Sequence, residues 1–450
     1  MGACMSSKVH SKYIMEKAER KVHFEVPLGS VVPSQASKTN DTASRSDLFR
    51  GSSGVISTQP SPHMLDRRSS SSNIQFGGAE KRAMNRRSSS SSVLGQGNAK
   101  SNGSSSIIVS SVHSWLLKDA NIAATQVENI EDVRILGKGL MGTVRLAKWR
   151  YNDNELYFAM KSINKEYILK HNDSRHVTNE REILRSLSSP FVIRLFGTHQ
   201  DDDNVYYMLE YAAGGELFHR LMKKRSFPAQ VAKFYASEIF LALEHVQSLG
   251  YVYRDLKPEN VMLDSSGHCK LVDFGFSRTP NKHGLCSTNC GTPAYLSPEQ
   301  LNGKFTNGYT KVVDWWSFGC LIFELMTGLT PFCKKFHDSA YEIYMRVLNG
   351  SISFPGSFDK DTKDLIKNLL RHDIKQRLVD PVLIKNAAYF NFPNCTWADV
   401  ETRRVHPPFT PVIKDCGDSY YFDDAPKDRH PRKPFKKNQG TNCANYMHGF

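Results

Sequence analysis

Two motifs constrain this chain of 450 residues more than any other feature: YRDLKPEN at residues 253–260 and VDFG at residues 272–275. Together they offer a carboxylate base, a lysine and two oxygen ligands for metal ions, namely Asp255, Lys257, Asn260 and Asp273. Phosphoryl transfer requires these groups. The alternative, a buried strand and turn with a paired Asp255, would leave unexplained the motifs that occur on both sides.

A glycine-rich segment, ILGKGLMGTV, lies upstream between stretches of alternating apolar residues. Its three glycines let backbone amides approach phosphate groups without a side-chain clash. Glycine triplets are usually ordinary turns, but the flanking alternation predicts a hairpin with this loop at its tip. The residues that we expect to contact ATP here are Leu136, Gly137, Lys138, Gly139, Leu140, Met141, Gly142, Thr143 and Val144.

A single lysine, Lys161, interrupts the next apolar run, LYFAMKSI. Such a lysine is usually an edge-strand charge, but its place after a glycine-rich hairpin fits a contact with the α- and β-phosphates. Helical periodicity over about residues 175–187 offers Glu180 and Glu182 as its partner. We favour Glu180, because it shares a helical face with Leu184, which would face the core.

These motifs follow the order of the eukaryotic protein-kinase fold, and so do FAMK, HVTNEREIL, GTPAYLSPE and VDWW. The chain resembles this fold over about residues 129–426. Within that fold, the chain is similar to the AGC group of serine/threonine kinases, nearest to the catalytic part of cAMP- and cGMP-dependent kinases. The similarity lies in Tyr253 in place of His, in DFGFSR and in the C-terminal YYFDDAP. The resemblance implies an α+β, bilobal fold. A small lobe of antiparallel strands with one helix would precede a mainly helical large lobe, and the cofactors would be ATP and two Mg²⁺ ions.

The resemblance also implies how the nucleotide is held. A hinge at residues 210–212 would bind adenine beside a gatekeeper, Leu209, and Glu216 would meet the ribose. Phe422 of the tail would fold back over the nucleotide. The other ATP-binding residues that it implies, besides the glycine-rich loop, are Ala159, Lys161, Glu180, Glu210, Ala212 and Leu263.

An activation segment is implied at residues 277–299, with Thr288 at the position of the activating phosphate. A phosphate brings about −1.5 to −2 charge and favours guanidinium or imidazolium partners. The matching socket positions hold His176, Arg254 and Arg278. The alternative is that these are unrelated surface bases. The resemblance further implies a buried ion pair between Glu299 and Arg377.

Acidic residues at the family's substrate positions predict protein substrates with basic residues before the phosphorylated Ser or Thr. The implied substrate-binding residues are Glu216, Glu259, Thr292 and Glu324, of which Thr292 would also bond Asp255 and Lys257. Ala294 departs from the pattern, because the cAMP-dependent enzyme has an acidic residue there. The preference for a more distant upstream arginine therefore stays open.

The predicted reaction is transfer of the ATP γ-phosphoryl group to Ser or Thr, in a signalling enzyme activated by phosphorylation of Thr288. An alternative is a catalytically silent kinase fold that acts as a membrane-tethered scaffold. Such proteins usually lack the strand lysine, the catalytic Asp or the DFG Asp. This chain keeps all three, as Lys161, Asp255 and Asp273.

Composition and the resemblance together divide the chain into five parts. We predict a membrane-targeting segment (1–33), a disordered Ser-rich linker (34–111), a docking helix with its lead-in (112–128), a kinase domain (129–390) and an AGC-type tail (391–450). The end of the tail, residues 427–450, is basic and then polar. It lacks an FxxF hydrophobic motif, which argues against regulation by docking such a motif on the small lobe.

The amino terminus, MGACMSSK, fits the pattern for myristoylation of Gly2, and Cys4 is placed for a second acyl chain. One myristoyl chain binds membrane only marginally, so a second signal is needed. Nine scattered cysteines and no secretory signal favour a reducing compartment. We therefore expect a cytoplasmic protein that associates with membrane through its acylated N-terminus; the alternative is an unmodified, disordered terminus.

Two near repeats in the linker, DRRSSSSN and NRRSSSSS, place arginines before Ser70 and Ser89. These sites match the predicted substrate type, which suggests autophosphorylation or autoinhibition, while the alternative is that they serve other kinases. The chain carries a net charge of +14, yet no aromatic-interleaved basic motif is present, so no nucleic-acid partner is expected. No segment matches a cyclic-nucleotide-binding domain. Control by cAMP or cGMP would therefore need a separate regulatory subunit.

Overall fold

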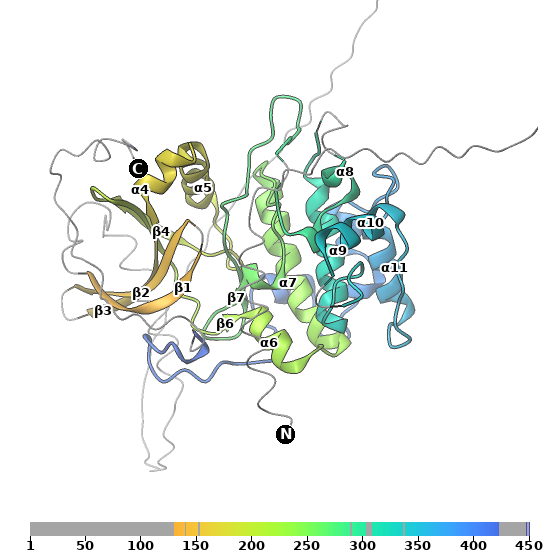
Figure 1. Cartoon of the computed structure of the whole chain (residues 1–450). Helices are drawn as coiled ribbons and strands as arrows, with labels where there is room; N and C mark the ends of the chain where they lie inside the picture. The colour runs from red at the N-terminus through yellow and green to blue at the C-terminus, as the bar shows by residue number, and fades with distance from the viewer. Residues whose placement is uncertain are drawn as a thin grey trace, which may run out of the picture. The chain divides into compact units, whose positions relative to one another are not determined.

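The computed structural model (Figure 1) describes residues 130–139, 141–151, 154–288, 290–302, 308–335, 338–422, Met447 and Phe450. All of these residues belong to one structural unit. Several sequence-based predictions lie outside them: the acylation sites Gly2 and Cys4, the linker serines Ser70 and Ser89, the docking helix at residues 112–128, and Leu140 in the glycine-rich loop. They stay predictions.

An antiparallel five-stranded sheet forms the small lobe, in the order β1-β2-β3-β5-β4. Its strands are β1 (Ile130–Lys138), β2 (Gly142–Tyr151), β3 (Asn154–Asn164), β4 (Leu195–Gln200) and β5 (Asn204–Leu209). In the β1–β2 hairpin Gly137 pairs with Val144, and the Gly139 N–H donates to the Gly142 carbonyl over 2.8 Å. A Cβ at Gly142 would lie 1.7 Å from the Ser162 carbonyl oxygen, so only glycine fits there.

Two helices, α4 (Lys165–Lys170) and α5 (Ser174–Ser186), follow β3 and precede β4. The α5 helix corresponds to the segment with helical periodicity in the sequence. Its buried side chains are Val177, Glu180, Ile183 and Leu184. They recur at helical spacing and pack this face into the core, which is why an amphipathic sequence of this kind forms a stable helix here.

The remaining elements build the large lobe, which is mainly helical (Figure 1). Its helices are α6 (Leu217–Lys224), α7 (Ala229–Ser248), α8 (Pro298–Leu301), α9 (Val312–Thr327), α10 (Ala340–Asn349), α11 (Lys360–Leu369), α12 (Pro381–Lys385) and α13 (Trp397–Glu401). A small sheet contains β6 (Gly215–Glu216), β7 (Val261–Leu263) and β8 (Cys269–Leu271). Short 3₁₀ turns are η2 (Pro258–Asn260), η3 (Pro293–Tyr295), η4 (Ala388–Phe390) and η5 (Tyr420–Phe422). The predicted α+β, bilobal fold is confirmed.

The α9 helix is the centre of the large lobe, because it is apolar on nearly all sides. Trp315 and Trp316 are fully buried, and α7 and α11 pack against the helix. A helix that is hydrophobic all round is stable only inside a protein.

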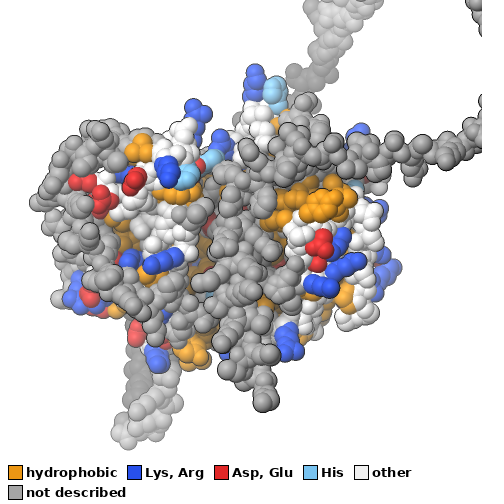
Figure 2. Space-filling model, in the orientation of Figure 1, with side chains coloured by type: hydrophobic (Ala, Val, Ile, Leu, Met, Phe, Trp, Pro, Cys, Tyr) orange, Lys and Arg blue, Asp and Glu red, His pale blue; other side chains and the backbone are white. Residues whose placement is uncertain are grey.

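Hydrophobic side chains gather on the visible face of the large lobe, in the region of α10 (Figure 2). On α10 itself Tyr341, Met345 and Leu348 are exposed, and their spacing places them on one face of the helix. A capping box between Ser339 and Glu342 starts this helix. Among the described residues, no helix is both long and apolar enough to cross a membrane.

Candidate active site

Three polar side chains, two of them from the loop before β7, surround one carboxylate, that of Asp255. Its Oδ2 accepts hydrogen bonds from Lys257 Nζ and Asn260 Nδ2, each over 2.8 Å. Its Oδ1 accepts from Thr292 Oγ1 over 2.9 Å, and Lys257 Nζ also donates to Thr292 Oγ1 over 2.8 Å. The structure thus brings the predicted base, the predicted lysine and the predicted Thr292 together at one point.

A buried carboxylate on α9, Asp314, holds the backbone of this loop. It accepts the N–H of Tyr253 over 3.0 Å and the N–H of Arg254 over 2.8 Å, and Gln247 Nε2 donates to it over 3.0 Å. Burial raises the pKa of Asp314 above its ordinary value, while these bonds oppose the rise. Arg254 has a φ of +72°, a strained conformation that the bonds to Asp314 help to maintain.

Lys161 on β3 lies between two carboxylates. Its Nζ is 2.6 Å from Glu180 Oε1 on α5 and 3.7 Å from Asp273 Oδ1. Glu182, the competing candidate from the sequence, instead contacts its neighbour Arg181 over 2.7 Å. Glu180 can therefore hold the Lys161 ammonium in place, as a lysine that binds phosphate would require.

The segment after β8 positions Asp273. This residue has a φ of +57°, and the next residue, Phe274, is fully buried with its ring 5.2 Å from that of Tyr253 in an edge-to-face contact. The Val272 N–H, just before Asp273, donates to the Asn260 backbone carbonyl over 2.9 Å. The buried phenylalanine keeps the preceding carboxylate turned toward Lys161.

The oxygen atoms of Asn260 and Asp273 fit Mg²⁺. Asn260 uses its amide nitrogen as a donor to the carboxylate and the backbone carbonyl of Asp255, both over 2.8 Å. Its amide oxygen is therefore directed away from Asp255. A carboxylate and an amide oxygen suit this hard cation, which usually takes one or two carboxylates together with substrate phosphates.

The hinge joins β5 to the large lobe. Within the sheet Ala159 pairs with Leu209, and Val144 pairs with Lys161, so these predicted nucleotide contacts lie on neighbouring strands. Leu263 is fully buried on β7. Glu210 carries an ion pair that the sequence did not suggest, because Lys270 Nζ on β8 lies 2.9 Å from its carboxylate. This pair ties the hinge to the strand that leads to Asp273.

The tail returns to the hinge and the small lobe. The Tyr211 hydroxyl donates to the Asp418 carbonyl over 2.8 Å, and its ring lies 5.7 Å from that of Phe422. Arg134 on β1 donates to the Phe422 carbonyl over 2.9 Å and to Ser419 Oγ over 3.2 Å. The structure therefore places Phe422 beside the hinge, and Arg134 is a contact that sequence reasoning missed.

The end of the chain makes contacts with the small lobe that sequence reasoning missed. Met447 and Phe450 pack against the main hydrophobic core, and the Phe450 ring meets that of Tyr207 on β5 edge-to-face at 5.2 Å. Gln200 Nε2 on β4 donates to the Met447 carbonyl over 3.1 Å. Docking on the small lobe therefore occurs without an FxxF motif, because methionine is an adaptable apolar side chain that can fill such a site.

Thr288 lies in the activation segment near one of its three predicted partners. Its carbonyl accepts a hydrogen bond from the Tyr309 hydroxyl over 2.5 Å, and Arg254 Nη1 donates to the same hydroxyl over 3.0 Å. His176 contacts Asp173 beside α5, and Arg278 forms a backbone bridge with Val252. Tyr309, which sequence reasoning did not select, thus links Arg254 to the Thr288 backbone.

The three predicted substrate carboxylates come from different elements. Glu216 ends β6 and lies 3.7 Å from His219 Nδ1, while Glu259 lies in η2 beside the catalytic loop. Glu324 is buried on α9 and accepts a hydrogen bond from the Tyr295 hydroxyl. Glu324 thus ties α9 to η3, close in sequence to Thr292.

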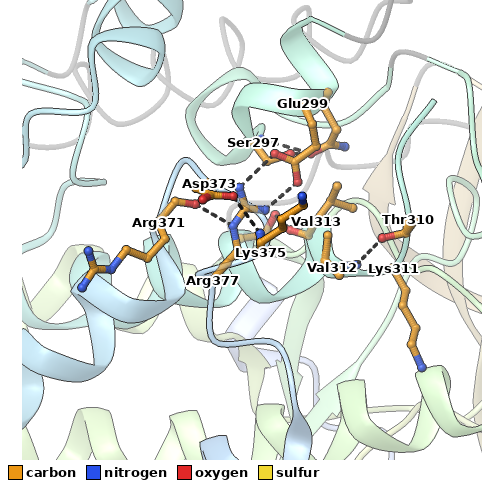
Figure 3. Close-up of polar contacts among 12 residues, drawn as sticks. Ser297, Glu299, Thr310, Lys311, Val312, Val313, Arg371, Asp373, Lys375 and Arg377 are labelled. Carbon is orange, nitrogen blue, oxygen red and sulfur yellow. Dashed lines mark hydrogen bonds and ion pairs between the residues drawn. The ribbon is translucent and has the colours of Figure 1, made fainter. Parts of the chain in front are cut away.

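A buried ion pair anchors the end of the activation segment, as expected. Arg377 Nη1 and Nη2 contact the two oxygens of Glu299 over 2.5 and 2.9 Å (Figure 3). Arg377 also donates from Nε to the Arg371 carbonyl over 2.8 Å, and its guanidinium lies 4.9 Å from the Trp316 ring centroid. All of these contacts fix α8 to the helical core.

Comparison with known proteins agrees with this geometry. The protein kinase domain family matches residues 130–390, more than half of the chain. A cAMP-dependent protein kinase catalytic subunit of Dictyostelium discoideum is 40% identical over 316 residues, which cover 69% of this chain and 47% of that protein. The chain thus matches about half the length of this relative.

Two further relatives are covered more fully. A RAC family serine/threonine-protein kinase homolog of Dictyostelium discoideum is 39% identical over 311 residues, 68% of this chain and 67% of that protein. The cAMP-dependent protein kinase type 3 of Saccharomyces cerevisiae is 39% identical over 315 residues, 69% and 75% respectively. With this likeness and the site described above, the chain belongs to the protein kinase family, within the AGC group of serine/threonine kinases.

Proposed function

We propose that this protein transfers the γ-phosphoryl group of ATP to Ser or Thr in protein substrates with upstream basic residues. The observation that carries the proposal is the position of Lys161, with Nζ 2.6 Å from Glu180 and 3.7 Å from Asp273, beside a catalytic loop in which Asp255 is already oriented. Protein kinases need the lysine–glutamate ion pair and the DFG aspartate to be in place at the same time.

The chain's own side chains account for the proton and the charge. As the substrate hydroxyl oxygen attacks the γ-phosphorus and the bond to the ADP oxygen breaks, Asp255 accepts the hydroxyl proton. Lys257, 2.8 Å from Asp255, offsets the negative charge that develops on the transferred group. Thr292 bonds both side chains and holds them in one geometry. When bound through Asn260 and Asp273, Mg²⁺ would neutralise phosphate charge.

Acidic side chains support the preference for basic substrates. Glu216, Glu259 and Glu324 lie on elements that surround the catalytic loop, and charge-assisted bonds from arginine to carboxylate are among the stronger hydrogen bonds in proteins. Glu216 and Glu324 already have partners, His219 and Tyr295. A substrate arginine would therefore join or replace an existing contact.

Phosphorylation of Thr288 would activate the enzyme in this proposal. Arg254 is close to the Thr288 backbone through Tyr309, so a phosphate on the Thr288 side chain would bring negative charge near this guanidinium. His176 and Arg278 remain the other proposed socket residues. Intact-protein and peptide mass spectrometry after incubation with Mg·ATP would map phosphate on Thr288, Ser70 and Ser89.

A separate cyclic-nucleotide-binding regulatory subunit is the proposed partner, because two of the relatives described are named as cAMP-dependent protein kinases. The exposed apolar face of α10, with Tyr341, Met345 and Leu348, is a surface of the kind that partner proteins cover. Membrane association through acyl chains on Gly2 and Cys4 completes the proposal. Mass spectrometry of the N-terminal peptide, from protein made in a eukaryotic cell, tests the acylation.

Two peptides that differ only in their arginines test the reaction and the specificity. One carries arginines three and two residues before a serine, and the other carries alanines there. We expect kcat/KM to favour the arginine peptide roughly tenfold or more, since each charge-assisted bond contributes about 1.5–3 kcal/mol. Equal rates on both peptides would refute the specificity, and transfer by Asp273→Ala at the wild-type rate would refute the catalytic assignment.

A further inference from the structure

Tyr309, in the segment that leads into α9, holds the activation segment through its backbone. Its N–H donates to the Cys286 carbonyl over 2.8 Å, and its carbonyl accepts the Cys286 N–H over 2.7 Å. Gly308 has a φ of +118°, and a Cβ there would lie 2.6 Å from the same Cys286 carbonyl oxygen. Only glycine therefore allows this close approach of the two segments. Tyr309 and Cys286 are both buried, in a small apolar cluster with Val252 and Val313.

The Tyr309 hydroxyl joins the activation segment to the catalytic loop. It donates to the Thr288 carbonyl over 2.5 Å and accepts from Arg254 Nη1 over 3.0 Å. The same guanidinium donates from Nε to the carbonyl of Phe276, just after the DFG motif, over 2.6 Å. Arg254 comes directly before Asp255 in the chain. One hydroxyl therefore connects the predicted phosphorylation site with the residue next to the predicted base.

We propose that Tyr309 is a positioning residue that holds the activation segment against Arg254 when Thr288 carries no phosphate. The acceptor of its hydrogen bond is the backbone carbonyl of Thr288, so the contact does not depend on the Thr288 side chain or on its modification. It gives the unphosphorylated enzyme part of the order that a phosphate would supply, and with it a basal activity. The inference rests on the proposed kinase function and deepens its proposed regulation at Thr288.

The chemistry of the phenol suits this role. Burial, followed by the nearby Cys290 thiol, raises the pKa of Tyr309 above its ordinary value, although Arg254 opposes the rise. The hydroxyl therefore stays protonated and can donate to Thr288 at any pH at which the enzyme would be assayed. Its oxygen accepts from a buried guanidinium, and hydrogen bonds to charged groups are stronger than bonds between neutral ones.

A phosphate on Thr288 would make this contact less important. It would bring about −1.5 to −2 charge near the Arg254 guanidinium, which the neutral hydroxyl holds in its absence. A charged oxygen binds arginine more strongly than a phenol does. The contribution of the Tyr309 hydroxyl is therefore large without phosphate and small with it. This dependence distinguishes a positioning role from a purely structural one, because a structural contribution would not change with phosphorylation.

Three substitutions isolate the contact. Tyr309→Phe removes only the hydroxyl oxygen and keeps the backbone pairing with Cys286. Thr288→Ala keeps the backbone carbonyl but cannot carry a phosphate. Tyr206→Phe is the matched control, because the Tyr206 hydroxyl is also buried and donates to Asp201 Oδ2 over 2.8 Å, in the small lobe. This control loses a hydroxyl bond of the same kind away from the activation segment.

Steady-state kinetics on the full chain test the proposal, with phosphate on Thr288 verified by mass spectrometry. In the Thr288→Ala background we expect Tyr309→Phe to lower kcat roughly tenfold, the size of one net hydrogen bond to a charged group. In protein phosphorylated on Thr288 the same change should lower kcat less than about threefold. Tyr206→Phe should change kcat less than about twofold in both. The same Tyr309→Phe factor in both backgrounds, or a Thr288→Ala protein without measurable turnover, would overturn the proposal.

Amide hydrogen exchange provides a readout that does not need activity. In the Thr288→Ala background Tyr309→Phe should speed exchange in the peptide that contains Cys286, while Tyr206→Phe should leave its rate unchanged. Unchanged exchange in the Tyr309→Phe protein would also overturn the inference. A wild-type protein without phosphoryl transfer would instead refute the proposed function, and one that takes no phosphate on Thr288 would refute its proposed regulation. In either case the exchange experiment decides the role of Tyr309 alone.

Discussion

Arg377 and Glu299 form a two-pronged ion pair although 78 residues separate them in the chain. The Arg377 side chain is fully buried and that of Glu299 nearly so. Removing one partner from such a pair leaves a buried charge uncompensated. We expect Arg377→Ala to lower the free energy of unfolding by about 3–5 kcal/mol, measured by urea denaturation.

An exposed pair of the same chemistry is the control. Arg404 lies 3.0 Å from Asp399, but its side chain is 66% exposed, and such pairs contribute about 0–1 kcal/mol. Arg404→Ala should therefore be nearly neutral. Similar losses of unfolding free energy in Arg377→Ala and Arg404→Ala would contradict the structural importance of the buried pair.

Lys161 and Asp273 should be essential for turnover but not for folding. Each of Lys161→Ala and Asp273→Ala removes a charge at the phosphate site, and the expected loss in kcat/KM is roughly 10²-fold to 10³-fold or more. The melting temperature should stay within a few degrees of wild type. Lys148→Ala is a control, because Lys148 lies on β2 and bridges Glu131 and Glu155, each at 3.3 Å. Persistent high activity in either active-site variant would contradict the assignment.

Arg134 should set the affinity for ATP through the tail. Without its bond to the Phe422 carbonyl, the tail would be held less firmly beside the hinge. Arg134→Ala should raise KM for ATP roughly threefold to tenfold with little change in kcat. Arg150→Ala, at an exposed arginine that pairs with Glu155, should change neither. If Phe422→Ala raises KM and Arg134→Ala does not, the link between them is wrong.

Asp338 gives the stability of the large lobe a pH dependence. The hydrogen bond from Arg346 lowers the pKa of Asp338 from 3.8 to about 2. Because the pKa is lower in the folded state, this contribution, on the order of 1 kcal/mol, is present above pH 4 and is lost as the pH falls through 2. The difference in unfolding free energy between wild type and Asp338→Asn should therefore shrink between pH 5 and pH 2. A difference independent of pH would contradict the ion pair.

Local patterns predicted the elements and the nearby contacts well. Helical periodicity was enough to select Glu180 over Glu182 as the partner of Lys161, because only a residue on the core face of α5 can reach β3. The position of the hairpin tip could likewise be predicted, because glycines lie between two strands in which apolar residues alternate with others. Such patterns depend only on neighbouring residues, which is why a single sequence reveals them.

Long-range contacts were out of reach of the same reasoning. Arg134 and Phe422 are 288 residues apart, and nothing in the sequence near either one marks the other. Tyr309 reaches Thr288 only through the folded activation segment. Phe450 was overlooked because the expected motif required a phenylalanine where Met447 stands. These contacts depend on tertiary packing, which has no periodic signature.

Gly267, in the turn between β7 and β8, is shaped by the tail rather than by the turn alone. Its φ is +94°, and a Cβ would lie 1.9 Å from the Phe409 carbonyl oxygen. Any side chain here must push residues 407–409 away. In a mutational scan of this enzyme, loss-of-function variants at Gly267 would therefore combine a strained turn with a displaced C-terminal segment. Substitutions at Gly267 should therefore be grouped with substitutions in the C-terminal segment when the effects of variants are compared.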